Sequence, residues 1–136
     1  MKSQLQIPHT IQVEVEQYLL AQLPEEACGF LSGAGQLVSA FHPIENELHS
    51  PIAYRMNPSQ QIQTMIRIEE QNLEVLAIIH SHPSGPAQPS TVDLREASWD
   101  GMPYIIIALQ NHIRPTWRGW LLTSEKYEEI PLFIKK

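Results

Sequence analysis

An apolar segment in the middle of the chain, residues 75–79, places the strongest constraint on the fold. All five of its side chains are apolar, so it has no polar face to present to water. Such a segment is typical of a strand in a sheet that is covered on both faces. Other helix and strand patterns are mixed without a strict βα repeat. We therefore expect an α/β (α+β) fold with a mixed, largely antiparallel sheet flanked by helices.

The hydrophobic pattern predicts three helices. The first has a helical period over residues 11–22, with Thr10 as its N-cap. The second begins near Pro58, a residue favoured in a first helical turn. The third covers residues 90–98 and is capped by Ser90. Three apolar residues share one face of the second helix: Ile62, Met65 and Ile66.

Short apolar runs between turn-forming residues predict the remaining strands. A turn signal at residues 32–35 separates the first two of them. The last three would close the sheet after the third helix. The predicted strands cover residues 27–31, 36–41, 52–56, 104–109, 116–122 and 127–134.

Length and composition bound the class of protein. A chain of 136 residues suits a single domain, which we expect over residues 1–136. The net charge of −6 argues against a nucleic-acid partner, which would need a basic surface. Cys28 is the only cysteine, so no intrachain disulfide can form, as is usual in a reducing compartment. With no apolar run long enough for a signal peptide or a membrane span, we expect a cytoplasmic protein without a membrane partner.

The fourteen residues that follow the apolar segment include two imidazoles, a hydroxyl and a carboxylate: His80, His82, Ser90 and Asp93. His80 and His82 are two apart, so in an extended strand they point the same way and can reach one ion. Asp93, in the first turn of the next helix, can complete a set of three ligands. Such nitrogen and oxygen ligands suit a catalytic zinc ion with an open fourth position, where the pKa of a water falls to about 7. Glu26 is the candidate base for such a site.

Each of these features has a simpler reading when it is taken alone. A lone His-x-His is most often a pair of surface or turn histidines. The spacing of Ser90 and Asp93 is that of a capping box, and an isolated Glu26 would be a solvated residue near a strand. The combination, with Pro83 and the seven-residue spacer between His82 and Ser90, favours a metal site.

The complete pattern, Glu26 followed by His80-x-His82-Pro83-x6-Ser90-x2-Asp93, resembles the JAMM (MPN-plus, Mov34/PAD-1) zinc metallopeptidase family. The likeness covers roughly residues 10–134, and the short length is similar to that of the small prokaryotic members. It implies an MPN/JAB α-β-α sandwich, similar to that of cytidine deaminases, and one Zn²⁺ per chain.

The resemblance also implies a role for each matched residue. His80, His82 and Asp93 would bind zinc, and Glu26 would take a proton from the attacking water and pass it to the leaving amine. Ser90 would hydrogen-bond the reacting water or the developing oxyanion. Glu25 is the rival base, but the family spacing to Gly29 selects Glu26. Asn46 would either contact substrate or form a turn.

The function implied is that of a zinc-dependent, deubiquitinase-like peptidase or isopeptidase. Its substrate would be the C-terminal tail of a ubiquitin-like or sulfur-carrier protein. One alternative is a non-catalytic MPN scaffold, although such relatives lose ligands that this chain keeps. Another is a zinc hydrolase acting on a small molecule, although zinc deaminases need a cysteine pair and this chain has one cysteine. The sequence leaves the oligomeric state open.

Overall fold

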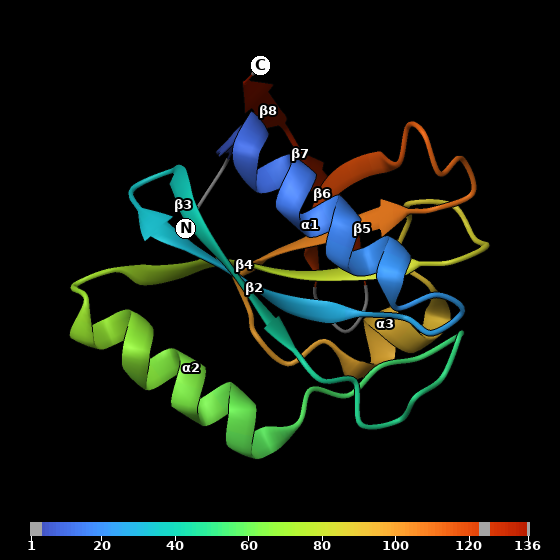
Figure 1. The fold of residues 1–136 in the computed structure, drawn as a ribbon, viewed down its shortest axis with the longest axis horizontal. Helices are drawn as coiled ribbons and strands as arrows, with labels where there is room; N and C mark the ends of the chain where they lie inside the picture. The colour runs from blue at the N-terminus through green and yellow to red at the C-terminus, as the bar shows by residue number, and fades with distance from the viewer. Residues whose placement is uncertain (1–3, 123–125, 136) are drawn as a thin grey trace.

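A computed structural model describes residues 4–122 and 126–135, and its centre is a mixed sheet of eight strands (Figure 1). The strand order is β7-β6-β5-β4-β2-β3-β1-β8. None of the helices in this part of the chain has the length and hydropathy needed to cross a bilayer. The strands are β1 (Leu5–Pro8), β2 (Cys28–Ala34), β3 (Leu37–Ile44), β4 (Glu74–His82), β5 (Pro103–Ala108), β6 (Thr116–Leu122), β7 (Tyr127–Ile130) and β8 (Leu132–Lys135).

Helices cover both faces of the sheet, which confirms the predicted α-β-α arrangement. Alternate residues of the strands point to opposite faces, so Leu31 of β2 joins one core cluster and Phe30 joins the other. The helix α1 (His9–Ala21) buries Ile11, Val15 and Leu19 in the first cluster. The helix α2 (Pro58–Glu70) and the segment around α3 (Thr91–Glu96) pack against the second.

The strand β4 is the apolar segment expected in the middle of the sheet, and it lies between β2 and β5. It runs antiparallel to β2 and parallel to β5. It extends through His82, beyond the predicted end at residue 79. The end of β4 therefore lies beside the beginning of β2, where Cys28 pairs with His80.

Two predictions near the chain ends are wrong. Residues 5–8 form a strand, β1, that the sequence pattern did not indicate, and α1 follows it directly. The N-cap is therefore Pro8 and not Thr10, and it makes no side-chain capping bond. The single strand predicted over residues 127–134 is divided at Pro131 into β7 and β8, because proline has no N–H to continue a ladder.

The strands β7 and β8 lie at opposite ends of the strand order although only Pro131 separates them. Residues two positions apart in a chain cannot be more than about 7 Å apart. The sheet must therefore curl until its two edges meet. A Cβ on Gly119 of β6, the neighbour of β7, would lie 2.8 Å from the side chain of Leu132 of β8, which shows how closely β8 packs on this end of the sheet.

The loop between β3 and α2 also differs from prediction. Residues 52–56 form no strand, and their only ladder contact within the described chain is an isolated bridge between Asn46 and Met56. The second helix begins as predicted, with Pro58 following the N-cap Asn57. Its buried residues, however, are Thr64 and Ile68. The apolar face expected from the pattern is exposed: Ile62, Met65 and Ile66.

Candidate metal centre

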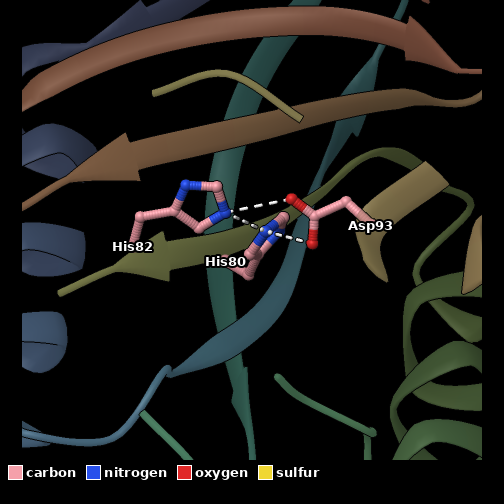
Figure 2. A group of neighbouring side chains, drawn as sticks. All are labelled: His80, His82 and Asp93. Carbon is pink, nitrogen blue, oxygen red and sulfur yellow. Dashed lines mark hydrogen bonds and ion pairs between the residues drawn. The ribbon is translucent and has the colours of Figure 1, made fainter. Parts of the chain in front are cut away.

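The two histidines leave the end of β4 on the same side and meet Asp93 from α3 (Figure 2). The Nε2 atoms of His80 and His82 are 3.1 Å apart. His80 Nε2 lies 3.1 Å from Asp93 Oδ1, and His82 Nε2 lies 3.0 Å from Asp93 Oδ2. All three side chains are buried. The structure thus brings together the three residues that the sequence proposed as ligands.

The N-terminus of α3 holds the carboxylate of Asp93 in place. Ser90 is the N-cap, and its Oγ accepts from the Asp93 N–H at 3.0 Å. The Asp93 Oδ2 accepts in return from the Ser90 N–H at 2.9 Å. This reciprocal pair is the predicted capping box. It orients the carboxylate towards the histidines.

The tautomer of His82 is set by the loop that follows β4. Its Nδ1 lies 2.7 Å from the carbonyl oxygen of Pro86. A carbonyl can only accept, so Nδ1 carries the hydrogen and Nε2 is left for a ligand bond.

The ring of His80 is stacked on Tyr54, with ring centroids 4.5 Å apart. Within residues 4–122 and 126–135, the buried Nδ1 of His80 has no hydrogen-bond partner.

Burial and the mutual contacts of the three residues set their charges. Burial lowers the pKa of the His80 imidazole, which favours its neutral form. Burial opposes protonation of His82 too, but hydrogen bonds to Asp93 and Pro86 raise its pKa overall. Burial alone would raise the pKa of Asp93, yet hydrogen bonds from His80 and His82 hold it well below its usual range. The carboxylate is therefore ionised beside two imidazoles.

This donor set fits a zinc ion. Ligand atoms at about 2.0–2.1 Å from a tetrahedral zinc are about 3.3 Å from one another. The two Nε2 atoms are 3.1 Å apart, and each lies 3.0–3.1 Å from one of the two Asp93 oxygens, which is close to that spacing. In a protein without a metal, two Nε2 atoms facing each other share one proton at most. A cation satisfies both nitrogens and the carboxylate at once.

Glu26 lies beside this centre, two residues before β2 begins. Its side chain is buried, with 5% of the residue exposed, and Oε1 has no hydrogen-bond partner in the described part of the chain. Burial raises the pKa of Glu26 to about 8; nearby Asp93 adds to the rise and His82 opposes it. Glu26, His82 and Ser90 line a common hollow of about 280 Å³. The rival Glu25 is half-buried and pairs with His49 at 3.0 Å.

Asn46 uses both ends of its amide within the protein. Its Nδ2 donates to the carbonyls of Glu26 and Ala53, at 2.9 and 3.1 Å. Its Oδ1 accepts from the N–H groups of Leu48 and Arg55, each at 3.1 Å. These contacts organise the loop between β3 and α2 and join it to Glu26. They favour the turn-forming role of Asn46, and a contact with substrate stays a prediction.

Three residues around the centre, Tyr54, Ser81 and Cys28, contact a ligand or the neighbouring backbone. The ring of Tyr54 covers His80, and the sequence pattern alone gave it no such role. Ser81, between the histidines, is fully buried and bonds to Ala27. Cys28 is also fully buried, its thiol donates to the Ile44 carbonyl, and burial raises its pKa to about 12. A thiol held in this protonated state is a poor nucleophile, as expected for a structural cysteine.

Comparison with known proteins gives the same picture as the geometry. The family described as prokaryotic homologs of the JAB domain matches residues 11–122. A "probable TtuB-protein conjugate cleaving protease" from Thermus thermophilus is 37% identical over 103 residues, which cover 75% of this chain and 68% of that protein. A desampylase from Pyrococcus furiosus is 32% identical over 112 residues, which cover 81% of this chain and 76% of the relative.

Solved structures share the fold. A protein from Desulfitobacterium hafniense superimposes with a TM-score of 0.89 at 28% identity, over 97% of this chain and 93% of the other. A JAB1/MPN domain protein from Archaeoglobus fulgidus superimposes with a TM-score of 0.63 at 18% identity, over 98% of this chain and 100% of the other. With a family match over most of its length, the chain belongs to the prokaryotic JAB family.

Proposed function

We propose that this chain is a zinc-dependent peptidase or isopeptidase that cleaves at the C-terminal tail of a ubiquitin-like or sulfur-carrier protein. The observation that carries the proposal is the convergence of His80, His82 and Asp93 beside Glu26. Glu26 has a buried oxygen without a partner in the described residues, as a base awaiting its proton would have. A non-catalytic scaffold would have no use for this combination.

The ligand set and the base divide the chemistry between them. When bound, zinc would polarise the scissile carbonyl and make a water easier to deprotonate. Glu26 would take the proton of the attacking water at Oε1 and later deliver it to the leaving amine nitrogen. Without a metal, burial raises the pKa of Glu26 to about 8, so the carboxyl is mostly protonated near neutral pH. The charge of a bound zinc ion would lower this pKa and leave the carboxylate ionised, ready to accept a proton and return it.

Ser90 would stabilise the charge that develops on the carbonyl oxygen. Its Oγ already accepts from the Asp93 N–H, and the residue lines the hollow shared with Glu26. The hydroxyl hydrogen is then left to donate to the oxyanion, and a donor placed where charge appears favours the transition state. The capping contact fixes the position of Oγ, so the same residue would serve α3 and the reaction.

Two hollows lined by residues of the centre or in contact with it support an extended substrate. The first, of about 280 Å³, is bordered by Glu26 and His82. The second, of about 240 Å³, is lined by aromatic residues that include Tyr54, whose ring stacks on His80. In the proposed binding mode, an extended chain would reach both hollows and cross the buried ligands on the way. We propose that small residues, such as a C-terminal Gly-Gly pair, make this crossing.

Two relatives support the substrate class. The Thermus thermophilus protein is described as cleaving conjugates of TtuB, and the Pyrococcus furiosus protein as a desampylase. Transferred to this chain, these descriptions indicate a protein conjugate as the substrate. The net charge of −6 argues against a nucleic-acid partner, and the unpaired Cys28 suits a reducing compartment, for which we propose the cytoplasm.

The test is cleavage of a ubiquitin-like sulfur-carrier protein that bears a C-terminal extension, followed by intact mass. The wild-type protein should carry one zinc ion and release the extension, and a chelator should stop it until zinc is returned. Glu26→Gln should retain zinc and turn over about 10²–10⁴-fold more slowly, because it has lost the base and kept the ligands.

Glu25→Gln is the matched control, since it makes the same change one residue earlier at a half-buried position outside the shared hollow. It should cleave like the wild type. Undiminished turnover by Glu26→Gln would move the base to another residue. Cleavage that persists in excess chelator would reject zinc chemistry altogether.

A further inference from the structure

The backbone on both sides of the Glu26 side chain is fully hydrogen-bonded. The Glu26 N–H donates to the Ser50 carbonyl at 2.8 Å, and the Glu26 carbonyl accepts from Asn46 Nδ2 at 2.9 Å. The Ala27 N–H donates to Ser81 Oγ at 2.9 Å, and the Ala27 carbonyl accepts from the Ser81 N–H at 3.0 Å. Two of these four bonds belong to Ser81, the residue between the two histidines.

The bond from Ala27 to Ser81 Oγ extends the pairing of β2 with β4 by one residue. Cys28 is opposite His80 at the start of β2, so Ala27 comes opposite Ser81. In a regular antiparallel pair two such residues exchange both bonds through their backbones. Here the Ser81 N–H makes one bond to Ala27, and the Ser81 hydroxyl replaces a backbone carbonyl in the other.

The position of Glu26 depends on these backbone bonds. Its Oε1 has no partner within the described residues, so that oxygen gives the side chain no anchor of its own. Successive side chains of a strand point to opposite faces. Ser81 therefore points away from the ligand side and bonds to the Ala27 N–H instead.

We infer that Ser81 is a positioning residue whose hydroxyl holds the Glu26–Ala27 peptide against β4 and so fixes the Glu26 carboxylate relative to His80 and His82. The inference rests on the proposed function, in which Glu26 is the base. One short segment of β4 then carries two ligands and also sets the distance from them to the base.

Replacing Ser81 with alanine should leave the two ligands on β4 in place and remove only the bond that positions Glu26. The variant keeps His80 and His82 but leaves the buried Ala27 N–H without its acceptor. The peptide must then shift or open to find another partner, and the Glu26 carboxylate moves with it. Misplacement of a reacting group by about 1 Å can cost about 10²-fold in rate. Zinc content should be unchanged, since the three ligands are untouched.

The experiment compares the wild type, Ser81→Ala, Ser81→Thr and Ser32→Ala. Zinc content, kcat and KM on the extended sulfur-carrier substrate, and hydrogen exchange of the Ala27 amide are measured for each. Ser81→Ala should lose at least about 10-fold in kcat, with KM and zinc content as in the wild type and faster exchange at Ala27. Ser81→Thr restores a hydroxyl, and with it slow exchange and most of kcat.

Ser32→Ala is the matched control, because Ser32 is equally buried in the sheet and bonds to His42 instead. It should turn over like the wild type. Three results would each overturn the inference. They are a kcat of Ser81→Ala within twofold of the wild type, loss of zinc from Ser81→Ala, and an equal loss of kcat in Ser32→Ala. An unchanged hydrogen-exchange rate of the Ala27 amide in Ser81→Ala would also overturn the inference, and this measurement needs no substrate. A wild-type protein that leaves the conjugate intact contradicts the proposed function instead.

Discussion

At the residue scale, a partly buried polar pair outside the centre links stability to pH. Ser32 Oγ and His42 Nε2 are 2.7 Å apart between β2 and β3. Burial, and then the charge of Arg67, lower the pKa of His42 below 6.5. The unfolded chain therefore binds this proton more readily than the folded one. The contribution to stability is complete above pH 6.5 and is lost as the pH falls from there through the folded pKa.

His42→Asn should abolish this part of the acid sensitivity. Denaturant unfolding of chelated protein between about pH 5 and pH 8 measures it. On acidification, the free energy of unfolding should fall further for the wild type than for the variant. The difference is about 1.4 kcal/mol for each unit by which folding lowers the pKa of His42. His112→Asn, at an exposed position, is the control. Parallel pH profiles for wild type and His42→Asn would contradict the expectation.

The residues of the centre differ in how far the sequence could reveal them. His80, His82 and Asp93 lie within fourteen residues, so strand and helix periods place them in reach of one another. Glu26 is distant in sequence, and only the glutamate-to-glycine spacing of the family that the chain resembles favours it over Glu25. The bond from Ser81 to Ala27 spans 54 positions, and no local pattern encodes it.

At the element scale, α3 depends on the same serine that we place in the reaction. Ser90→Ala removes the cap of a six-residue helix and should cost about 0.5–2 kcal/mol of stability as well as activity. Ser90→Asn supplies an equally good cap but no hydroxyl. It should therefore unfold like the wild type and still cleave slowly. Thermal unfolding and turnover are compared across the three proteins, and full activity in Ser90→Asn would remove the hydroxyl from the mechanism.

Element boundaries were predictable where one local signal decided them. The capping spacing located the start of α3, and the apolar run located β4 but not its end at His82. In α2 periodicity could not choose between two faces. Ile62, Met65 and Ile66 form one stripe, while Thr64 and Ile68 form another that packs on the sheet. Contacts with β3 and β4 decide which stripe is buried, and these depend on the tertiary fold.

At the scale of the whole molecule, the curled sheet could not be predicted from its strands. A single proline between two short strands reads locally as one interrupted strand. In the structure β8 instead pairs with β1 at the far edge, in parallel from Leu5 with Leu132 onwards. A bond from Trp117 Nε1 on β6 to Glu16 of α1, at 2.8 Å, spans 101 positions across the same curl. Such long-range pairings have no signature in a single sequence.

The proposed metal centre should also couple to the stability of the whole molecule. His80 and His82 belong to the central strand and Asp93 to a helix on its face, so the three donors meet only in the folded chain. An ion that binds only the folded state stabilises it by about 2.7 kcal/mol at 100 times its Kd. The Tm of chelated protein should therefore rise with free zinc, as measured by calorimetry over a zinc series. Glu26→Gln keeps all three donors and should show the same rise, whereas His82→Ala should show none. An equal rise in His82→Ala would place the stabilising ion at another site.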